Sequence, residues 1–136
     1  MTIELTTPAI DVGLITSNLA GQTRFYGEVL GLAASGSVEI PHVGTITRFA
    51  AGQSTLRLMV PEKAPASPAR DGGFVGTVGI GYIALRIANL AEMVKRVEDA
   101  GFVIAIPIRT LRPGVEVALV EDADGNTVEL MQESAS

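Results

Sequence analysis

Apolar and polar residues alternate in short runs along much of the first half of the chain. Four β-rich runs predict strands there, at 9–16, 33–40, 44–50 and 54–60. A helix is expected between the first two, because Asn18 stands at an N-cap position and Gly31 stands where a left-handed residue ends a helix. Its apolar stripe consists of Phe25, Tyr26, Val29 and Leu30. Pro41 and His42 mark the first turn between strands, and Gly52 marks the second.

The second half of the chain repeats this order of elements. Strands are predicted at 79–87, 103–109, 114–121 and 127–132. The helix between the first two has one apolar face, made of Leu90, Met93, Val94 and Val97. Asn89 with Glu92 predicts a capping box at its start, and Gly101 is expected to end it. Asp124-Gly125 predicts the last hairpin turn.

Short segments of the two halves also match in sequence. Asn18-Leu19-Ala20 recurs as Asn89-Leu90-Ala91, and the run 55–59 recurs at 127–131, at offsets of 71 and 72 residues. An internal duplication explains both matches. The sequence therefore predicts an α+β fold of two tandem βαβββ modules.

The two predicted modules are expected to form a single domain over residues 1–136. Module one covers about 9–60, a Pro- and Gly-rich linker covers 61–76, and module two covers about 77–133. Four strands and one helix are too few to bury both faces of a sheet. We therefore expect the modules to share one mixed, cup-shaped sheet with the helices outside, and the cup to be the pocket for a small molecule.

Composition and charge narrow the classes of function. The net charge is −5 and the ten Lys and Arg residues are scattered, so we expect no nucleic-acid partner. No apolar run reaches the roughly 20 residues of a membrane helix, and the N-terminal segment lacks the positive start of a signal peptide. We expect a cytoplasmic protein without a membrane partner. The absence of Cys removes thiol nucleophiles and zinc–thiolate sites.

Three segments in this order resemble the vicinal oxygen chelate superfamily, which contains glyoxalase I, bleomycin resistance proteins and extradiol dioxygenases. They are the opening VGLITSNL, then TRFYGEVLGL, and the closing EDADGNTVELMQE, in which Ala123 replaces the Pro of the familiar Asp-Pro-Asp-Gly-Asn ending. The resemblance spans about residues 9–133. It implies the glyoxalase-like fold and a homodimer.

The resemblance also implies where the functional residues stand. Members that use a metal place one ligand on the first strand of each half and one on the last strand, typically two His and two carboxylate or Gln oxygens. Those positions fall here on Asp11, Arg57, Tyr82 and Glu129. Only Asp11 and Glu129 are ordinary metal ligands.

Arg57 argues against a metal in this chain. A guanidinium stays charged and offers only donors, so it cannot ligate. At about 4 Å from a divalent cation the repulsion is roughly 8 kcal/mol at an effective dielectric constant of 20. We therefore expect no cofactor. The alternative is a divalent metal such as Mg, Mn, Zn or Fe, held by Asp11 and Glu129.

Each of these residues also has a purely structural interpretation. Asp11, Arg57 and Glu129 would then form a buried charge cluster that holds the sheet together. Tyr82 would line the wall of the cup rather than donate to a substrate oxygen. His42, the single histidine, is expected in a turn and not in a catalytic triad. The segment 122–126 is expected to be a hairpin turn rather than a calcium loop.

Three hypotheses of function follow. The first is an isomerase or lyase that carries out acid–base chemistry on a small oxygenated metabolite without a conventional metal site, with Asp11, Arg57, Tyr82 and Glu129 as catalytic residues. The second is a protein that sequesters a drug or toxic metabolite, although four Phe, two Tyr and no Trp provide little stacking surface. The third is a divergent metal-dependent glyoxalase or dioxygenase.

Overall fold

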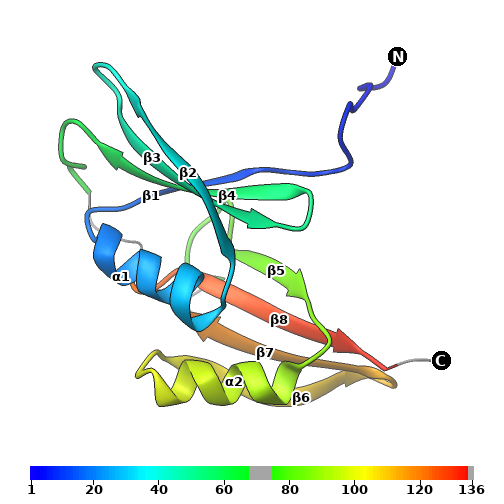
Figure 1. The fold of residues 1–136 in the computed structure, drawn as a ribbon. Helices are drawn as coiled ribbons and strands as arrows, with labels where there is room; N and C mark the ends of the chain where they lie inside the picture. The colour runs from blue at the N-terminus through cyan, green and yellow to red at the C-terminus, as the bar shows by residue number, and fades with distance from the viewer. Residues whose placement is uncertain (68–74, 135–136) are drawn as a thin grey trace. The chain divides into compact units, whose positions relative to one another are not determined.

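The computed structural model describes residues 1–67 and 75–134. The chain divides into two compact units, Met1–Ala66 and Ser67–Ser136. The first unit contains, in order, β1 (Val12–Ile15), α1 (Leu19–Thr23), η1 (Arg24–Val29), β2 (Ala33–Ile40), β3 (Gly44–Ala51) and β4 (Ser54–Pro61). The second contains β5 (Tyr82–Arg86), α2 (Leu90–Asp99), β6 (Ile104–Arg112), β7 (Val115–Glu121) and β8 (Thr127–Glu133) (Figure 1).

Each unit forms a mixed four-stranded sheet with the same topology. The strand orders are β1-β4-β3-β2 and β5-β8-β7-β6. In each unit the first strand runs parallel to the last, and the remaining pairs are antiparallel. The predicted α+β fold of two βαβββ modules is confirmed. The single domain and the shared cup stay predictions, and residues 68–74 of the predicted linker lie outside the described residues.

The duplication extends to the register of the strands. Gly13 on β1 pairs with Arg57 on β4, and Ala84 on β5 pairs with Glu129 on β8. The chain leaves the first strand of each sheet in the same way. The amide of Thr16 donates to the carbonyl of Met59 at 2.9 Å, and the amide of Ile87 donates to that of Met131 at 2.8 Å. Equivalent positions of the two modules can therefore be matched residue by residue.

The first helix differs from the expected regular α-helix. It starts as predicted, with the Asn18 side chain accepting from the amide of Gly21 at 3.0 Å, and Gly31 follows it with φ 77°. From Arg24 to Val29, however, it has π-helical geometry. The neighbouring Phe25 and Tyr26 are both buried there, with their rings edge to face at 4.8 Å. The wider turn of a π-helix is consistent with the burial of two consecutive aromatic residues on one side.

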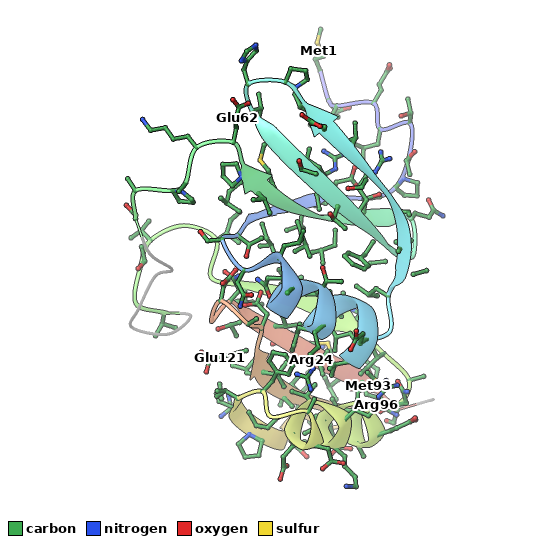
Figure 2. The ribbon with its side chains drawn as sticks, turned by 60° about the vertical axis from the view of Figure 1, so that its left-hand side comes forward. Met1, Arg24, Glu62, Met93, Arg96 and Glu121 are labelled. Carbon is green, nitrogen blue, oxygen red and sulfur yellow. The ribbon has the colours of Figure 1, made fainter. Side chains whose placement is uncertain are left out.

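The second helix matches its predicted bounds but not its predicted cap. All four residues of its apolar face are buried, among them Met93, which is labelled in Figure 2. The capping box from Asn89 and Glu92 is wrong, because the Asn89 amide donates to the Glu92 carboxylate at 3.2 Å and caps no backbone group. The side-chain oxygen of Gln132 on β8 accepts from the amide of Leu90 at 2.8 Å instead. This bond ties the start of α2 to its own sheet.

The turn between β7 and β8 is held by one buried carboxylate. Asp122 Oδ1 accepts from the amides of Asp124 and Asn126 at 2.9 and 2.8 Å, and its Oδ2 accepts from the Asn126 side chain at 2.8 Å. The predicted hairpin is confirmed, since β7 and β8 pair antiparallel on either side of this segment. Asp122 uses its oxygens to shape the turn.

None of the helices in the described ranges has the length and hydrophobicity that crossing a membrane requires.

Candidate functional site

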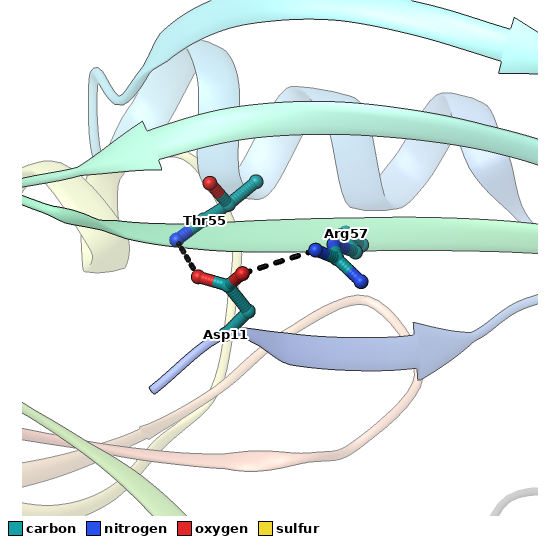
Figure 3. Close-up of polar contacts among 3 residues, drawn as sticks. All are labelled: Asp11, Thr55 and Arg57. Atoms are coloured by element: carbon teal, nitrogen blue, oxygen red, sulfur yellow. Dashed lines mark hydrogen bonds and ion pairs between the residues drawn. The ribbon is translucent and has the colours of Figure 1, made fainter. Parts of the chain in front are cut away.

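Asp11 and Arg57 meet at the edge of the first sheet where β1 begins (Figure 3). Oδ2 of Asp11 accepts from a terminal nitrogen of Arg57 at 3.0 Å, and its Oδ1 accepts from the backbone amide of Thr55 at 2.8 Å. Because Val12 pairs with Leu56, Asp11 stands one step before the parallel ladder. Its carboxylate therefore accepts a hydrogen bond from the Thr55 amide at the start of the ladder, and it holds the Arg57 side chain in place at the same time.

The Asp11–Arg57 pair is exposed and not buried. The side chains are 41% and 46% exposed, respectively. Exposed ion pairs contribute about 0–1 kcal/mol to stability. The interpretation as a buried charge cluster that holds the sheet together is therefore wrong for these two residues. A contribution this small leaves the pair available for a functional role.

The two faces of the first sheet have different compositions. Strand alternation and register place Phe49, Leu56 and Leu58 on one face, and all three are buried. This face meets the helix, because a Cβ added to Gly27 of η1 would lie 2.9 Å from the Phe49 ring. Asp11 and Arg57 lie on the opposite face. We call this second face the open face of module one.

The open face holds a second guanidinium that sequence reasoning missed. Arg48 on β3 is the cross-strand partner of Arg57 on β4, and residues directly opposite in an antiparallel pair share a face. The sequence signal is the alternation of polar and apolar residues within 45–51, which places Arg48 on the face opposite to the buried Phe49. That Arg48 lies directly opposite Arg57 could not be seen without the register of β3 against β4.

In module two, Tyr82 and Glu129 occupy the positions equivalent to Asp11 and Arg57. Tyr82 pairs with Thr127 and Ala84 pairs with Glu129, so both side chains lie on one face of the second sheet, one step apart along neighbouring strands. Tyr82 is 50% exposed. Glu129 is partly buried and has the buried Leu119 as its cross-strand neighbour on β7. Each module thus presents its own pair of polar residues.

The residues of module one do not fit a divalent metal. Both oxygens of Asp11 already accept hydrogen bonds, one of them from a permanent cation. Within residues 1–67 and 75–134, no three His, Cys, Asp or Glu side chains are grouped in a way that could hold a metal ion. His42 lies in the turn between β2 and β3, with φ 66°. A metal-free site stays a prediction.

Comparison with known proteins identifies the family. The profile of the Glyoxalase/Bleomycin resistance protein/Dioxygenase superfamily matches residues 10–130. No match was found among curated protein sequences.

Solved structures share the fold at low sequence identity. A glyoxalase family protein from Bacillus cereus aligns with a TM-score of 0.84 and 16% identity, over 98% of this chain and 97% of that one. A glyoxylase/bleomycin resistance protein/dioxygenase domain from Frankia sp. EAN1pec gives a TM-score of 0.77 at 16% identity, over 100% and 96%. Lactoylglutathione lyase from Agrobacterium tumefaciens gives 0.63 at 21%, over 90% and 91%. The chain belongs to the Glyoxalase/Bleomycin resistance protein/Dioxygenase superfamily.

Proposed function

We propose that the protein is a metal-independent enzyme that moves a proton on a small oxygenated metabolite, in an isomerase or lyase reaction. The observation that carries this proposal is the Asp11–Arg57 ion pair of 3.0 Å, which stands at positions where metal-using relatives are expected to hold ligands. A fixed cation can take over the electrostatic task of a metal, because it stabilises the negative charge that develops on a substrate oxygen.

The chemical step is the removal of a proton from a carbon next to a carbonyl group. The C–H bond breaks, its proton passes to a carboxylate, and its electron pair moves to the carbonyl oxygen as an enolate forms. Arg57 stabilises this oxygen. Returning the proton to the opposite face of the same carbon re-forms the carbonyl and completes an isomerisation. Expelling a leaving group from the next carbon along, as the carbonyl re-forms, completes a lyase reaction.

Asp11 is the candidate base of module one. Its carboxylate accepts hydrogen bonds from the Thr55 amide and from Arg57, and these bonds hold it beside the guanidinium. Each carboxylate oxygen has a second lone pair, so Asp11 still has room to accept a proton. In the proposed step Asp11 takes the proton.

Exchange of substrate protons with deuterated water tests this function. We expect the protein to catalyse exchange of the protons next to the carbonyl of at least one small 2-oxo acid, followed by proton NMR. Replacing Asp11 with Asn should lower the rate about 100-fold or more, because the amide cannot accept the proton.

Two results would contradict the proposed function. Stoichiometric binding without exchange would indicate a sequestering protein. An exchange rate that is unchanged in Asp11→Asn would remove Asp11 from the mechanism.

A further inference from the structure

Arg48 extends away from its cross-strand partner Arg57. A Cβ added to Gly36 on β2 would lie 3.4 Å from a terminal nitrogen of Arg48, so this guanidinium lies over β2. Arg57 reaches in the other direction, to Asp11 beside β1. Since β3 and β4 are the two central strands of the sheet, the guanidinium groups diverge across the open face. Like charges directly opposite each other destabilise a sheet, and this divergence reduces their repulsion.

Within residues 1–67 and 75–134, no side chain pairs with the charge of Arg48. Its Nε is buried from solvent and donates to no acceptor among the described residues. Asp11 is the single acidic residue that the strand register places on the open face of module one, and its carboxylate is bound to Arg57 and Thr55. Two guanidinium groups and one carboxylate leave an excess of one positive charge. A buried donor without an acceptor calls for an explanation, and a bound anion provides one.

The surroundings of Arg48 are small or apolar. The absence of a side chain at Gly36 lets the guanidinium lie close to the backbone of β2, and on β1 Gly13 has no atom within 4 Å of the position of its missing Cβ. Ile46 follows Arg48 on the same face of β3, and its cross-strand neighbours are Val38 and Met59. An anion at Arg48 would therefore have a carbon surface beside it.

We propose that Arg48 binds the carboxylate of a small organic acid, and that this carboxylate defines the substrate class. This inference rests on the proposed function, since it assigns a substrate class to the same open face as Arg57. A planar guanidinium matches the two oxygens of a carboxylate. The single excess charge matches a monoanion better than a phosphate dianion, and the apolar neighbours match a short carbon skeleton.

The Nε–H group of Arg48 provides a direct reporter of binding. Because this group is shielded from water, its proton exchanges slowly and its signal is observable in an NMR spectrum of the arginine side chains. The signal is assigned as the one that Arg48→Lys and Arg48→Gln both lose. Titration with 2-oxobutyrate should shift it saturably in the wild-type protein, and titration with the neutral 2-oxobutyramide should not.

Variants then measure the contribution of Arg48 to affinity. Isothermal titration with 2-oxobutyrate should show that Arg48→Gln binds at least about tenfold more weakly than the wild type. Arg48→Lys should lie between the two, because Lys keeps the charge and loses the planar fork. Lys95→Gln is the matched control and should bind like the wild type. Lys95 lies on α2 and pairs with Asp99, which raises its pKa, so both Gln variants remove one positive charge.

The outcomes separate this inference from the proposed function. Binding that depends on Arg48, without proton exchange, supports the carboxylate site and refutes the enzyme. If the protein catalyses proton exchange but Arg48→Gln binds 2-oxobutyrate as tightly as the wild type, the enzyme is supported and the carboxylate site at Arg48 is refuted. No saturable shift at tens of millimolar 2-oxobutyrate, equal binding of the amide, or tighter binding of inorganic phosphate at the same signal would overturn the proposal.

Discussion

Replacing Gly44 with Ala is expected to destabilise module one by about 3 kcal/mol. Gly44 starts β3 with φ 155°, and its backbone packs directly against the end of β4. An added Cβ would lie 2.3 Å from the carbonyl oxygen of Val60 and 2.8 Å from Cα of Pro61. Both contacts are with backbone atoms, so no side chain can rotate away to relieve them. Urea unfolding followed by circular dichroism measures the loss.

Gly52→Ala is the control for this prediction. Gly52 lies in the turn at the other end of β3 with φ 59°, and nothing lies within 4 Å of an added Cβ. We expect a cost of about 1 kcal/mol, from the left-handed backbone alone. The explanation by close packing is refuted if Gly44→Ala loses no more stability than Gly52→Ala.

Arg57→Ala is expected to reduce catalysed proton exchange about 100-fold or more, while the free energy of unfolding changes by less than about 1 kcal/mol. The effect on activity is large because the variant removes the fixed charge that faces the developing enolate. The effect on stability is small because the ion pair with Asp11 is nearly half exposed. Exchange rates and urea unfolding of the same preparations provide both numbers.

The matched control for Arg57→Ala is Lys95→Ala. It also removes one positive charge and one exposed ion pair, the Lys95–Asp99 contact of 2.9 Å within α2. We expect its exchange rate to equal that of the wild type. If Arg57→Ala instead loses stability to the same extent as it loses activity, the ion pair has a structural role.

Most of the fold could be predicted from the sequence because its signals are local. Strand alternation, Asn18 as a cap and Gly31 as a helix end are each contained in a few neighbouring residues, and all three agree with the structure. The cap of α2 was mispredicted, since it comes from Gln132 on β8, 42 positions away from Leu90. Contacts across such separations depend on how strands and helices pack.

The candidate site was predictable only in part, for the same reason. Asp11 and Arg57 were expected on the first and last strands of module one, and the structure joins them. Their exposure was not foreseen, because burial depends on which face of the sheet the helix covers. Arg48 was missed because its place beside Arg57 is set by the register of β3 against β4, which alternation alone does not determine.

Elemental analysis of protein purified without chelator tests the central claim most directly, namely that a fixed cation stands where relatives hold a metal. The account predicts far less than one equivalent of Mg, Mn, Zn or Fe per chain, and proton exchange that continues in the presence of a chelator. One equivalent of a divalent metal that is lost in Asp11→Asn, together with the activity, would contradict it.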